Sequence, residues 1–276
     1  MKIVVTGATG FIGTHVVANL LKRKIDVITT GTDLNKMQKK SWNDKVKFIM
    51  LDINHEISDN IINEIASADK VIHLIWSGLP DYKNLNHFEI FLMPQYFFLK
   101  RLIDSGLKDL TITGTCLEYG LKNGYLTEEI KSDPTNPYAI AKDTLRKFLN
   151  QLQIKSNFKL KWARVFYTFG EGQSKNSILG QLDLAISNGE SNFNMSKGEQ
   201  LRDYLPVEEL ANQIVNLSLD NEKNGIYNCC SGVPISIRRM VEEYVSKKDK
   251  KINLNLGYYE YPDYEPLAFW GKKFDY

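Results

Sequence analysis

Cysteine and histidine are scarce in this sequence of 276 residues, and long apolar runs are missing. The three cysteines lack metal-ligand spacing, and the four histidines, the last of which is His87, have no acidic or Cys partner at such spacing, so we expect no metal. Apolar runs such as 90–93 are far shorter than the roughly 20 residues that span a bilayer. The first residues lead into a strand-like segment without an apolar export signal. We therefore expect a cytoplasmic protein with reduced thiols and no membrane helix.

Neither sign of charge dominates the sequence. Lys and Arg total 35, Asp and Glu total 33, and the net charge is +2. Because the basic residues are dispersed along the chain, we expect no nucleic-acid partner. A hydrophobic content of 43% with 18 Gly and 8 Pro excludes collagen-like, coiled-coil and wholly disordered chains.

Short segments rich in Val and Ile alternate with segments of helical period through the first half of the chain. Strands are expected near 2–6, 25–30, 45–51, 70–75, 109–113 and 159–166, and helices near 11–23, 57–66, 94–105 and 137–153. This alternation predicts an α/β fold of Rossmann type, a doubly wound parallel sheet with helices on both faces.

Beyond Gly170 the expected elements are shorter, with helices near 176–188, 207–219 and 236–247 and strands near 191–194 and 225–229. They predict a smaller C-terminal lobe. We expect a nucleotide-binding domain over 1–166, to which a segment near 205–224 returns, and a substrate lobe over 167–276.

The strongest local motif is Gly7-x-x-Gly10-x-x-Gly13, which follows the first strand and begins a helix. Glycines at such a turn let the backbone approach a pyrophosphate, whose charge then lies at the positive end of the helix. The motif predicts a dinucleotide cofactor. Between the glycines, we expect Thr9, Phe11 and Ile12 to contact this cofactor as well.

The end of the second strand bears on the choice between NAD and NADP, because an acid there binds the ribose 2′-OH and repels a 2′-phosphate. This sequence has Gly31 and Thr32 there and no acid before Asp33, which favours NADP(H) and leaves NAD(H) possible. Asp52 and Ile53 are expected near the adenine; the alternative for Asp52 is that it caps a helix. Three lysines could face the phosphate or form a solvated basic surface: Lys36, Lys39 and Lys40.

Tyr138 and Lys142 lie four residues apart on a predicted helix and so share one face. An ammonium there would lower the pKa of the phenol, which could then exchange a proton with a substrate oxygen. The pair follows Asn136-Pro137 and the fifth strand, at the end of a parallel sheet where active sites lie. Two other pairs have the same spacing but are expected to be packing residues: Tyr96 with Lys100, and Tyr244 with Lys248.

Together these motifs resemble those of extended short-chain dehydrogenase/reductases of the nucleotide-sugar epimerase/dehydratase group. The resemblance covers nearly the whole chain and is carried by the glycine motif and by segments 71–74, 115–120, 136–142 and 202–207. It implies a nucleotide-sugar substrate and a homodimer.

The resemblance also implies roles for single residues. Thr115 matches the Ser or Thr that binds the sugar C4 oxygen, Tyr138 matches the acid/base, and Lys142 matches the residue that holds the nicotinamide ribose. Arg202 matches the arginine that binds the substrate diphosphate; the alternative is a surface arginine paired with an acid. The resemblance places Leu74 and Trp76 beside the cofactor, and Ser77, Tyr82, Cys116, Tyr167 and Phe193 on the substrate side.

Departures from the family pattern narrow the chemistry. The 4,6-dehydratases of this group carry Asp-Glu after the catalytic Thr, where this chain has Cys116-Leu117, so dehydration is disfavoured. The 3,5-epimerase-reductases pair a Cys with a distant His; no histidine follows His87, and Cys116 is expected mainly to pack. Tyr167 stands where the family usually has an Asn that contacts the diphosphate. The Tyr-rich segment 258–266 could be a substrate wall, a dimer surface or lobe packing.

We therefore expect NADPH-dependent reduction of the C4 keto group of a nucleotide-activated 4-keto-6-deoxy sugar, as in deoxysugar or surface-polysaccharide biosynthesis. An alternative is a nucleotide-sugar 4-epimerase, which would retain NAD tightly. A second alternative is a catalytically silent nucleotide-binding module, against which the intact Thr115, Tyr138 and Lys142 argue.

Overall fold

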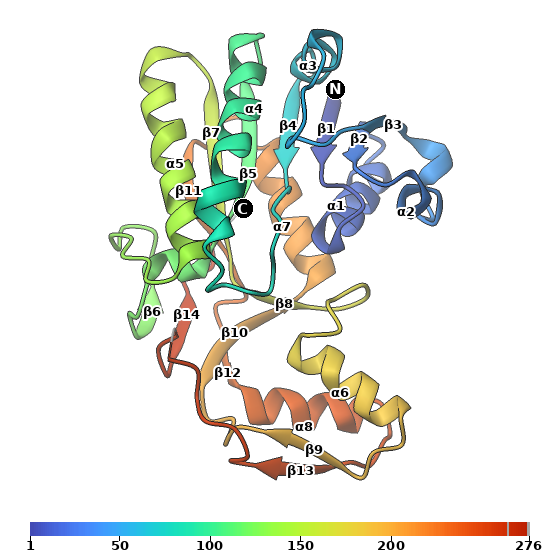
Figure 1. Cartoon of the computed structure of the whole chain (residues 1–276), viewed down its shortest axis with the longest axis vertical. Coiled ribbons are helices and arrows are strands. Elements are labelled where there is room, and N and C mark those ends of the chain that lie inside the picture. Colours follow the sequence, from blue (N-terminus) through green and yellow to red (C-terminus); the bar gives the residue numbers. More distant parts are fainter. Residues whose placement is uncertain (264, 275–276) are drawn as a thin grey trace.

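The centre of the molecule is a parallel sheet of seven strands in the order β11-β7-β5-β4-β1-β2-β3 (Figure 1). The computed structural model describes residues 1–263 and 265–274. It confirms the expected α/β fold of Rossmann type. The strands of this sheet are β1 (Lys2–Thr6), β2 (Asp26–Gly31), β3 (Lys47–Met50), β4 (Lys70–His73), β5 (Asp109–Thr115), β7 (Lys159–Val165) and β11 (Gly225–Cys229).

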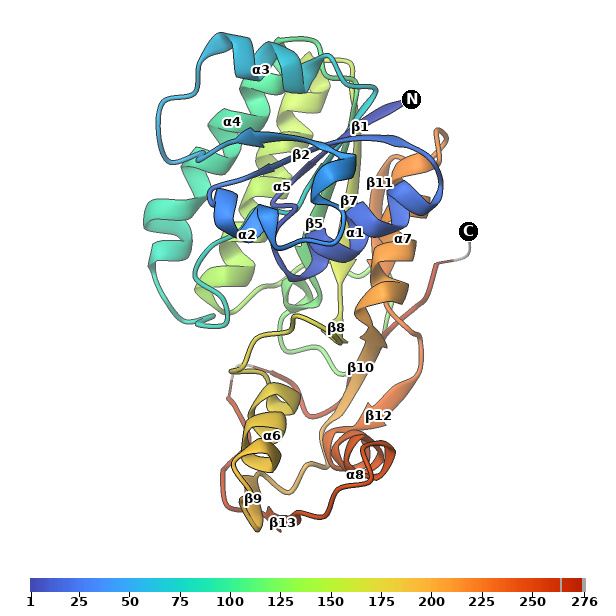
Figure 2. The same ribbon diagram turned by 90° about the vertical axis from the view of Figure 1, so that its right-hand side faces the viewer.

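Helices cover both faces of the sheet (Figures 1 and 2). Alternate side chains of β1 show why: Ile3 and Val5 pack into one hydrophobic core and Val4 into the other. The first core includes α1 (Phe11–Lys22) and α7 (Val207–Leu219), and the second includes α3 (Asp59–Ala66), α4 (Leu92–Asp104) and α5 (Pro137–Lys155).

A smaller part of the molecule lies below the carboxyl ends of the sheet strands in Figure 1. Its hydrophobic core includes Leu182, Met195 and Val241. Its elements are α6 (Ile178–Ser187), α8 (Ile237–Lys247), the paired strands β9 (Asn192–Met195) and β13 (Asn253–Leu256), and a sheet of β12 (Pro234–Ser236), β10 (Leu201–Pro206) and β8 (Tyr167–Phe169). Strand β14 (Phe269–Gly271) pairs with β6 (Gly124–Leu126).

All expected helices and strands are present, and their ends differ from the expected ones by no more than two residues. The sequence analysis missed the short elements, because a strand of three to six residues gains its stability from a distant partner and carries little periodicity of its own. The missed elements are β6, β8, β10, β12, β13, β14, α2 (Leu34–Gln38), η1 (Asn43–Lys45), the π-helical turn η2 (His87–Phe91) and η3 (Cys116–Tyr119).

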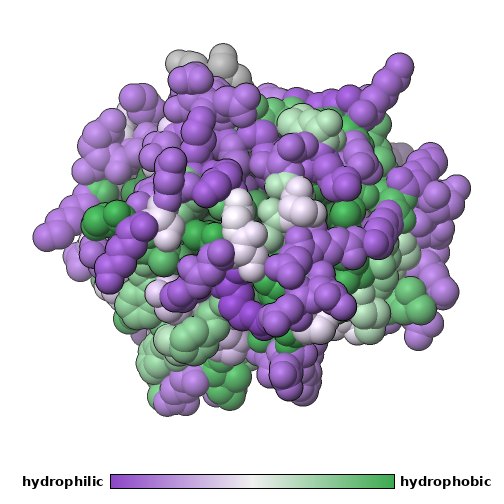
Figure 3. Space-filling model, turned by 90° about the horizontal axis from the view of Figure 1, so that it is seen from above, coloured by the Kyte–Doolittle hydropathy of each residue, from purple (hydrophilic) through white to green (hydrophobic). Residues whose placement is uncertain are grey.

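Hydrophilic residues predominate on the face seen from above, at the end of the molecule where β1 begins (Figure 3). Among the described residues, no helix combines the length and the apolar character that crossing a membrane requires. Within the same residues no group of three or more His, Cys, Asp and Glu side chains is arranged to hold a metal ion.

Candidate active site

The loop between β1 and α1 is folded tightly against the end of β4. Gly7 has a φ of 72°, and a Cβ there would lie 3.1 Å from the backbone of Leu74. A Cβ at Gly13 would lie 2.3 Å from the Gly7 carbonyl oxygen, so these positions require glycine. Helix α1 begins at Phe11 with Gly10 as its N-cap, without a side-chain cap or an acid in its first turn. The N–H groups of that turn are left for an anion, and the loop fits a dinucleotide pyrophosphate.

The residues at the ends of β2 and β3 lie next to this loop. A Cβ at Gly31 would lie 3.2 Å from the Thr9 hydroxyl oxygen, and Thr32 is exposed. The carboxylate of Asp33 accepts the Lys36 backbone N–H at 3.1 Å and so caps α2. Position 31 at this end of the sheet is a glycine, and the first acid after it, Asp33, caps α2.

Asp52 closes a turn through its carboxylate, which accepts the backbone N–H of Asn54 at 3.0 Å. The alternative that Asp52 caps a helix is wrong, because α3 begins at Asp59 with Ser58 as its N-cap. The neighbouring Ile53 is buried in the sheet core.

Thr115, Tyr138 and Lys142 come together at the carboxyl end of β5. Thr115 ends this strand, Tyr138 lies in the first turn of α5, and both side chains are buried, close enough for Thr115 to influence the pKa of Tyr138. The Lys142 ammonium donates to the Thr113 carbonyl oxygen at 2.8 Å and lies 4.2 Å from the centre of the Trp76 ring. One hydroxyl pair and one ammonium therefore share a single buried corner of the sheet.

Local signals fix Tyr138 at this corner. The Asn136 side chain accepts the Ala139 N–H at 2.9 Å, and Pro137 begins the helix, as both residue types favour. The Tyr138 ring is then enclosed by the rings of Trp76, Tyr82 and His87, whose centres lie 6.0, 5.5 and 5.3 Å away.

The electrostatics of the pair differ from the sequence-based expectation that Lys142 lowers the pKa of Tyr138. Burial raises the pKa of Tyr138, with smaller contributions in the same direction from Tyr82 and Glu118, and outweighs the opposing hydrogen bond from Thr115. Burial also lowers the pKa of Lys142 to about 7, against the opposing charge of Glu118. The phenol therefore keeps its proton more firmly than a solvent-exposed tyrosine.

Arg202, on β10, is 1% exposed, and protein groups accept four hydrogen bonds from its guanidinium. It donates to Glu265 at 2.9 and 3.2 Å and to the backbone carbonyls of Leu201 and Leu267 at 2.9 and 3.1 Å. The alternative was a surface arginine paired with an acid. Arg202 is paired with an acid, Glu265, but it is buried and does not lie on the surface. The Tyr167 hydroxyl donates to the same Glu265.

The remaining residues assigned to the substrate side lie in different surroundings. Cys116 is buried against Tyr138 and its neighbours, and burial raises the pKa of its thiol, whereas Ser77 is exposed. Phe193 is not brought to the site; it is 7% exposed and packs in the core of the smaller part. Within the Tyr-rich segment, Tyr258 and Tyr259 are exposed, and Tyr264 lies outside the described residues.

The two other Tyr/Lys pairs lie away from this corner. The Tyr96 ring packs against Phe148, with ring centres 5.4 Å apart, and Lys100 binds Asp104. The Tyr244 hydroxyl donates to Asp183 at 2.8 Å, and Lys248 binds the same carboxylate.

The sequence analysis missed two acids, of which Glu118 is buried and Glu265 partly buried. Glu118 follows Thr115 by three residues, a spacing typical of a capping box, which the sequence analysis did not exploit. Glu265 has no local signal, because its contact with Arg202 joins segments 63 residues apart.

Known proteins with similar sequences indicate the family to which this chain belongs. The profile of the NAD dependent epimerase/dehydratase family matches residues 3–230. A dTDP-6-deoxy-L-talose 4-dehydrogenase (NAD(+)) from Aggregatibacter actinomycetemcomitans is 30% identical over 99% of this chain and 100% of its own length. A UDP-glucose 4-epimerase from Halalkalibacterium halodurans is 26% identical over 88% of this chain and 79% of its own.

Among solved structures, UDP-N-acetylglucosamine 4-epimerase from Methanobrevibacter ruminantium superimposes with a TM-score of 0.84 at 22% identity, covering 99% of this chain and 89% of its own. A dTDP-glucose 4,6-dehydratase from Streptomyces venezuelae, with NAD bound, gives a TM-score of 0.83 at 16% identity, covering 99% and 88%. The family match and the fold together define an extended short-chain dehydrogenase/reductase. More specifically, the chain belongs to the NAD-dependent epimerase/dehydratase family.

Proposed function

We propose that this protein catalyses NAD(P)H-dependent reduction of the C4 keto group of a nucleotide-linked 4-keto-6-deoxy sugar. The observation that carries the proposal is that the buried side chains of Thr115 and Tyr138 come together beside Lys142, whose ammonium is held by the Thr113 carbonyl of the same strand. The relative that acts at C4 of a dTDP-linked 6-deoxy sugar aligns over its full length, which supports the same class of substrate.

The hydroxyls of Thr115 and Tyr138 would both bind the C4 oxygen of the sugar. When bound, the nicotinamide cofactor would supply the hydride. Tyr138 would donate its proton as the oxygen becomes an alkoxide, and Thr115 would hold that oxygen in place. Because burial raises its pKa, the phenol is protonated at neutral pH, which is the form that a proton donor in the reductive direction requires.

The cofactor would lie along the carboxyl ends of β1, β2 and β4. The amides at the start of α1 would bind its pyrophosphate, and Leu74 and Trp76 would border its nicotinamide half. At the other half, Gly31 and Thr32 offer no carboxylate to a ribose 2′-OH, which supports NADPH. The name of the talose dehydrogenase specifies NAD(+), so the preference of this chain is to be settled by titration.

We assign residues 167–276 to the nucleotide sugar, and residues 1–166 with the returning segment near 205–224 to the cofactor. Arg202 would bind the diphosphate through its planar fork, with Tyr167 nearby. Tyr82 and Cys116, which contact the surroundings of Tyr138, would border the sugar.

An alternative activity is a nucleotide-sugar 4-epimerase, which the UDP-glucose 4-epimerases among the relatives favour. An epimerase regenerates its cofactor in every turnover and retains NAD tightly, whereas a reductase consumes added NAD(P)H. A catalytically silent nucleotide-binding module would do neither.

The test is a spectrophotometric assay of NADPH and NADH oxidation with a panel of dTDP-, UDP- and GDP-linked 4-keto-6-deoxy sugars, with the corresponding 4-hydroxy nucleotide sugars assayed in parallel for epimerisation at C4. We expect stoichiometric oxidation with one nucleotide series. Interconversion of 4-epimers without net oxidation, together with co-purified NAD, would establish the epimerase instead. Absence of both reactions across the panel would support the silent module.

We also propose that the protein is a homodimer that uses α4 and α5. These helices pack side by side and expose large apolar side chains, of which Phe97 is 55% and Phe148 38% exposed. Phe97→Glu should convert the dimer to a monomer in light scattering of the eluted protein. A wild-type mass of one chain would contradict this assignment.

A further inference from the structure

We propose that Glu118 is a positioning residue of the site: its buried carboxylate fixes the backbone of Thr115 and offsets the positive charge of Lys142. The inference rests on the proposed function, because it concerns the pair Thr115 and Tyr138 that the function assigns to the sugar oxygen. Glu118 contacts neither of the groups proposed to react, and it acts through the residues that do.

The carboxylate of Glu118 is 0% exposed and receives hydrogen bonds from three different donors. The Thr115 backbone N–H lies 2.9 Å away, the Trp162 indole N–H 2.9 Å, and the Arg164 Nε–H 2.8 Å. Because these partners are all donors, they suit an ionised carboxylate, which accepts only. The side-chain oxygen of Thr115 in turn accepts the Leu117 N–H at 3.3 Å and completes a capping box.

The strand leaves room for this carboxylate at Gly114. A Cβ there would lie 2.4 Å from Glu118 Oε1 and 2.1 Å from the Trp162 indole nitrogen, so a larger residue would displace both. The flanking residues bind the two ends of the site: the Thr113 carbonyl accepts the Lys142 ammonium, and the Thr115 N–H donates to Glu118. Three consecutive residues of β5 therefore connect the lysine, the acid and the proposed substrate hydroxyl.

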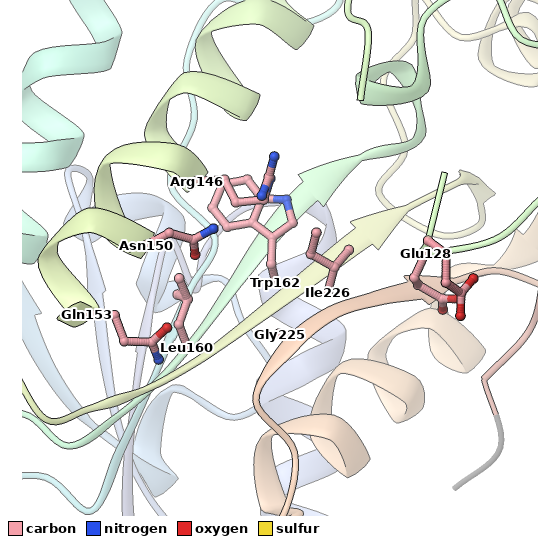
Figure 4. Close-up of a pocket in the computed structure, with 9 residues that line it drawn as sticks. Glu128, Arg146, Asn150, Gln153, Leu160, Trp162, Gly225 and Ile226 are labelled. Atoms are coloured by element: carbon pink, nitrogen blue, oxygen red, sulfur yellow. The ribbon is translucent and has the colours of Figure 1, made fainter. Parts of the chain in front are cut away.

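The charge of Glu118 lies at a fully buried position. Trp162 and Arg146 line a pocket of about 430 Å³ between α5, β7 and β11 (Figure 4), but Glu118 itself is not part of its wall. Arg146 Nε lies 4.0 Å from the carboxylate and is itself paired with Asp143. In a buried environment a single charge influences nearby protonation strongly.

Several other groups face Lys142 and Tyr138, the two residues whose pKa values Glu118 influences. Lys142 faces the Trp76 ring, the Thr113 carbonyl and His73, whose pKa burial lowers to about 3, so the imidazole is neutral. Tyr138 faces Tyr82, His87 and Cys116 in addition to Glu118. Glu118 raises the pKa of both Lys142 and Tyr138, so its removal should lower both.

The experiment compares Glu118→Gln with Asp109→Asn in the full-length protein. Asp109 is a matched control, because it is a buried carboxylate on the same strand, at its amino end, paired there with Lys70 and Lys161. Two readouts are taken: the titration of Lys142 by NMR of lysine labelled with ¹³C at Cε, assigned with Lys142→Met, and the pH dependence of kcat for NAD(P)H oxidation.

For Glu118→Gln we expect the Lys142 midpoint to fall below the wild-type pKa of about 7, and kcat to fall on the order of tenfold to a hundredfold, since small displacements of a catalytic group have such effects. The pH profile should shift to lower pH. Asp109→Asn should change stability and leave both midpoint and profile in place.

An unchanged Lys142 midpoint in folded Glu118→Gln, or the same shift in Asp109→Asn, would overturn the proposal. If Glu118→Gln does not fold, Trp162→Phe removes one donor to Glu118 and keeps an aromatic ring, and it must move the Lys142 midpoint for the proposal to stand. The NMR titration needs no substrate, so it separates failure of this inference from failure of the proposed function, which wild-type turnover tests.

Discussion

The guanidinium of Arg202 is bound by Glu265, which lies 63 residues further along the chain and accepts its Nη2–H at 2.9 Å. A phosphate group presents oxygens of the same charge to the same fork. If Arg202 binds the diphosphate of a nucleotide sugar, Glu265 and the substrate therefore compete for it, and the pair determines how tightly the nucleotide binds.

Arg202→Ala should weaken binding of dTDP or UDP by about tenfold to a hundredfold, because a hydrogen bond to a charged group contributes roughly 1.5–3 kcal/mol. NADPH affinity should not change, since the proposed cofactor loop belongs to the other part of the molecule. Calorimetric titration with each nucleoside diphosphate and, separately, with NADPH measures both. Equal nucleotide affinity in the variant and the wild type would remove Arg202 from the proposed binding site.

Glu265→Gln tests the competition directly. The amide keeps the shape of the side chain but loses the charge that a diphosphate must displace, so nucleotide affinity should rise while NADPH affinity stays constant. A fall in nucleotide affinity would show instead that Glu265 orients Arg202 toward the substrate.

Tyr138→Phe should lower kcat by two or more orders of magnitude, because a general acid typically contributes about 10²–10⁴-fold. Cofactor affinity should barely change. Tyr96→Phe and Tyr244→Phe are matched controls, since each tyrosine has a lysine four residues later and lies outside the site. Loss of turnover in either control with normal turnover in Tyr138→Phe would mean that the wrong pair was chosen.

NADPH should bind more tightly than NADH, because no acid stands at Gly31 to repel a 2′-phosphate. Fluorescence titration of the two reduced cofactors measures the ratio. Gly31→Asp should reverse the preference by adding the missing charge at the end of β2. Tighter NADH binding by the wild type, or NAD that co-purifies in stoichiometric amount, would contradict this expectation and favour the epimerase.

The parts of the site that could be predicted from the sequence depend on local signals. Asn136 and Pro137 mark the start of α5 in the sequence itself, so the location of Tyr138 in its first turn follows from capping preferences. The glycine spacing after β1 likewise reflects contacts within one turn and with the adjacent β4.

The parts that could not be predicted depend on distant contacts. Arg202 lies on β10 and Glu265 precedes β14. These strands have six and three residues and are too short to be predicted from periodicity, so the contact between the two residues could not be predicted either. The raised pKa of Tyr138 results from burial by rings on the segment after β4, and neighbouring residue types alone do not reveal burial. For this reason the expectation that Lys142 lowers the pKa of Tyr138 is wrong.

Lys142 should make the stability of the protein depend on pH above neutrality. Its pKa is about 7 in the folded protein against an ordinary value of 10.5, so between these values the unfolded chain binds a proton that the folded protein does not. Stability therefore rises with pH across this window, by at most about 1.4 kcal/mol per pH unit from this one group. Below pH 7 both states are protonated, and the folded protein bears the cost of a buried ammonium.

The measurement is the free energy of unfolding in urea at pH 6, 7, 8 and 9 for the wild type, Lys142→Met and the control Lys100→Met, whose lysine is paired with Asp104 on the exposed side of α4. Relative to Lys142→Met, the wild type should gain stability steadily from pH 7 to pH 9, because only the wild type relieves a buried charge by losing a proton. The difference between the wild type and Lys100→Met should stay constant over the same range, since an exposed, paired lysine remains protonated there. A constant difference for Lys142→Met as well would mean that Lys142 is hydrated or paired in solution, and the low pKa of the site would have to be abandoned.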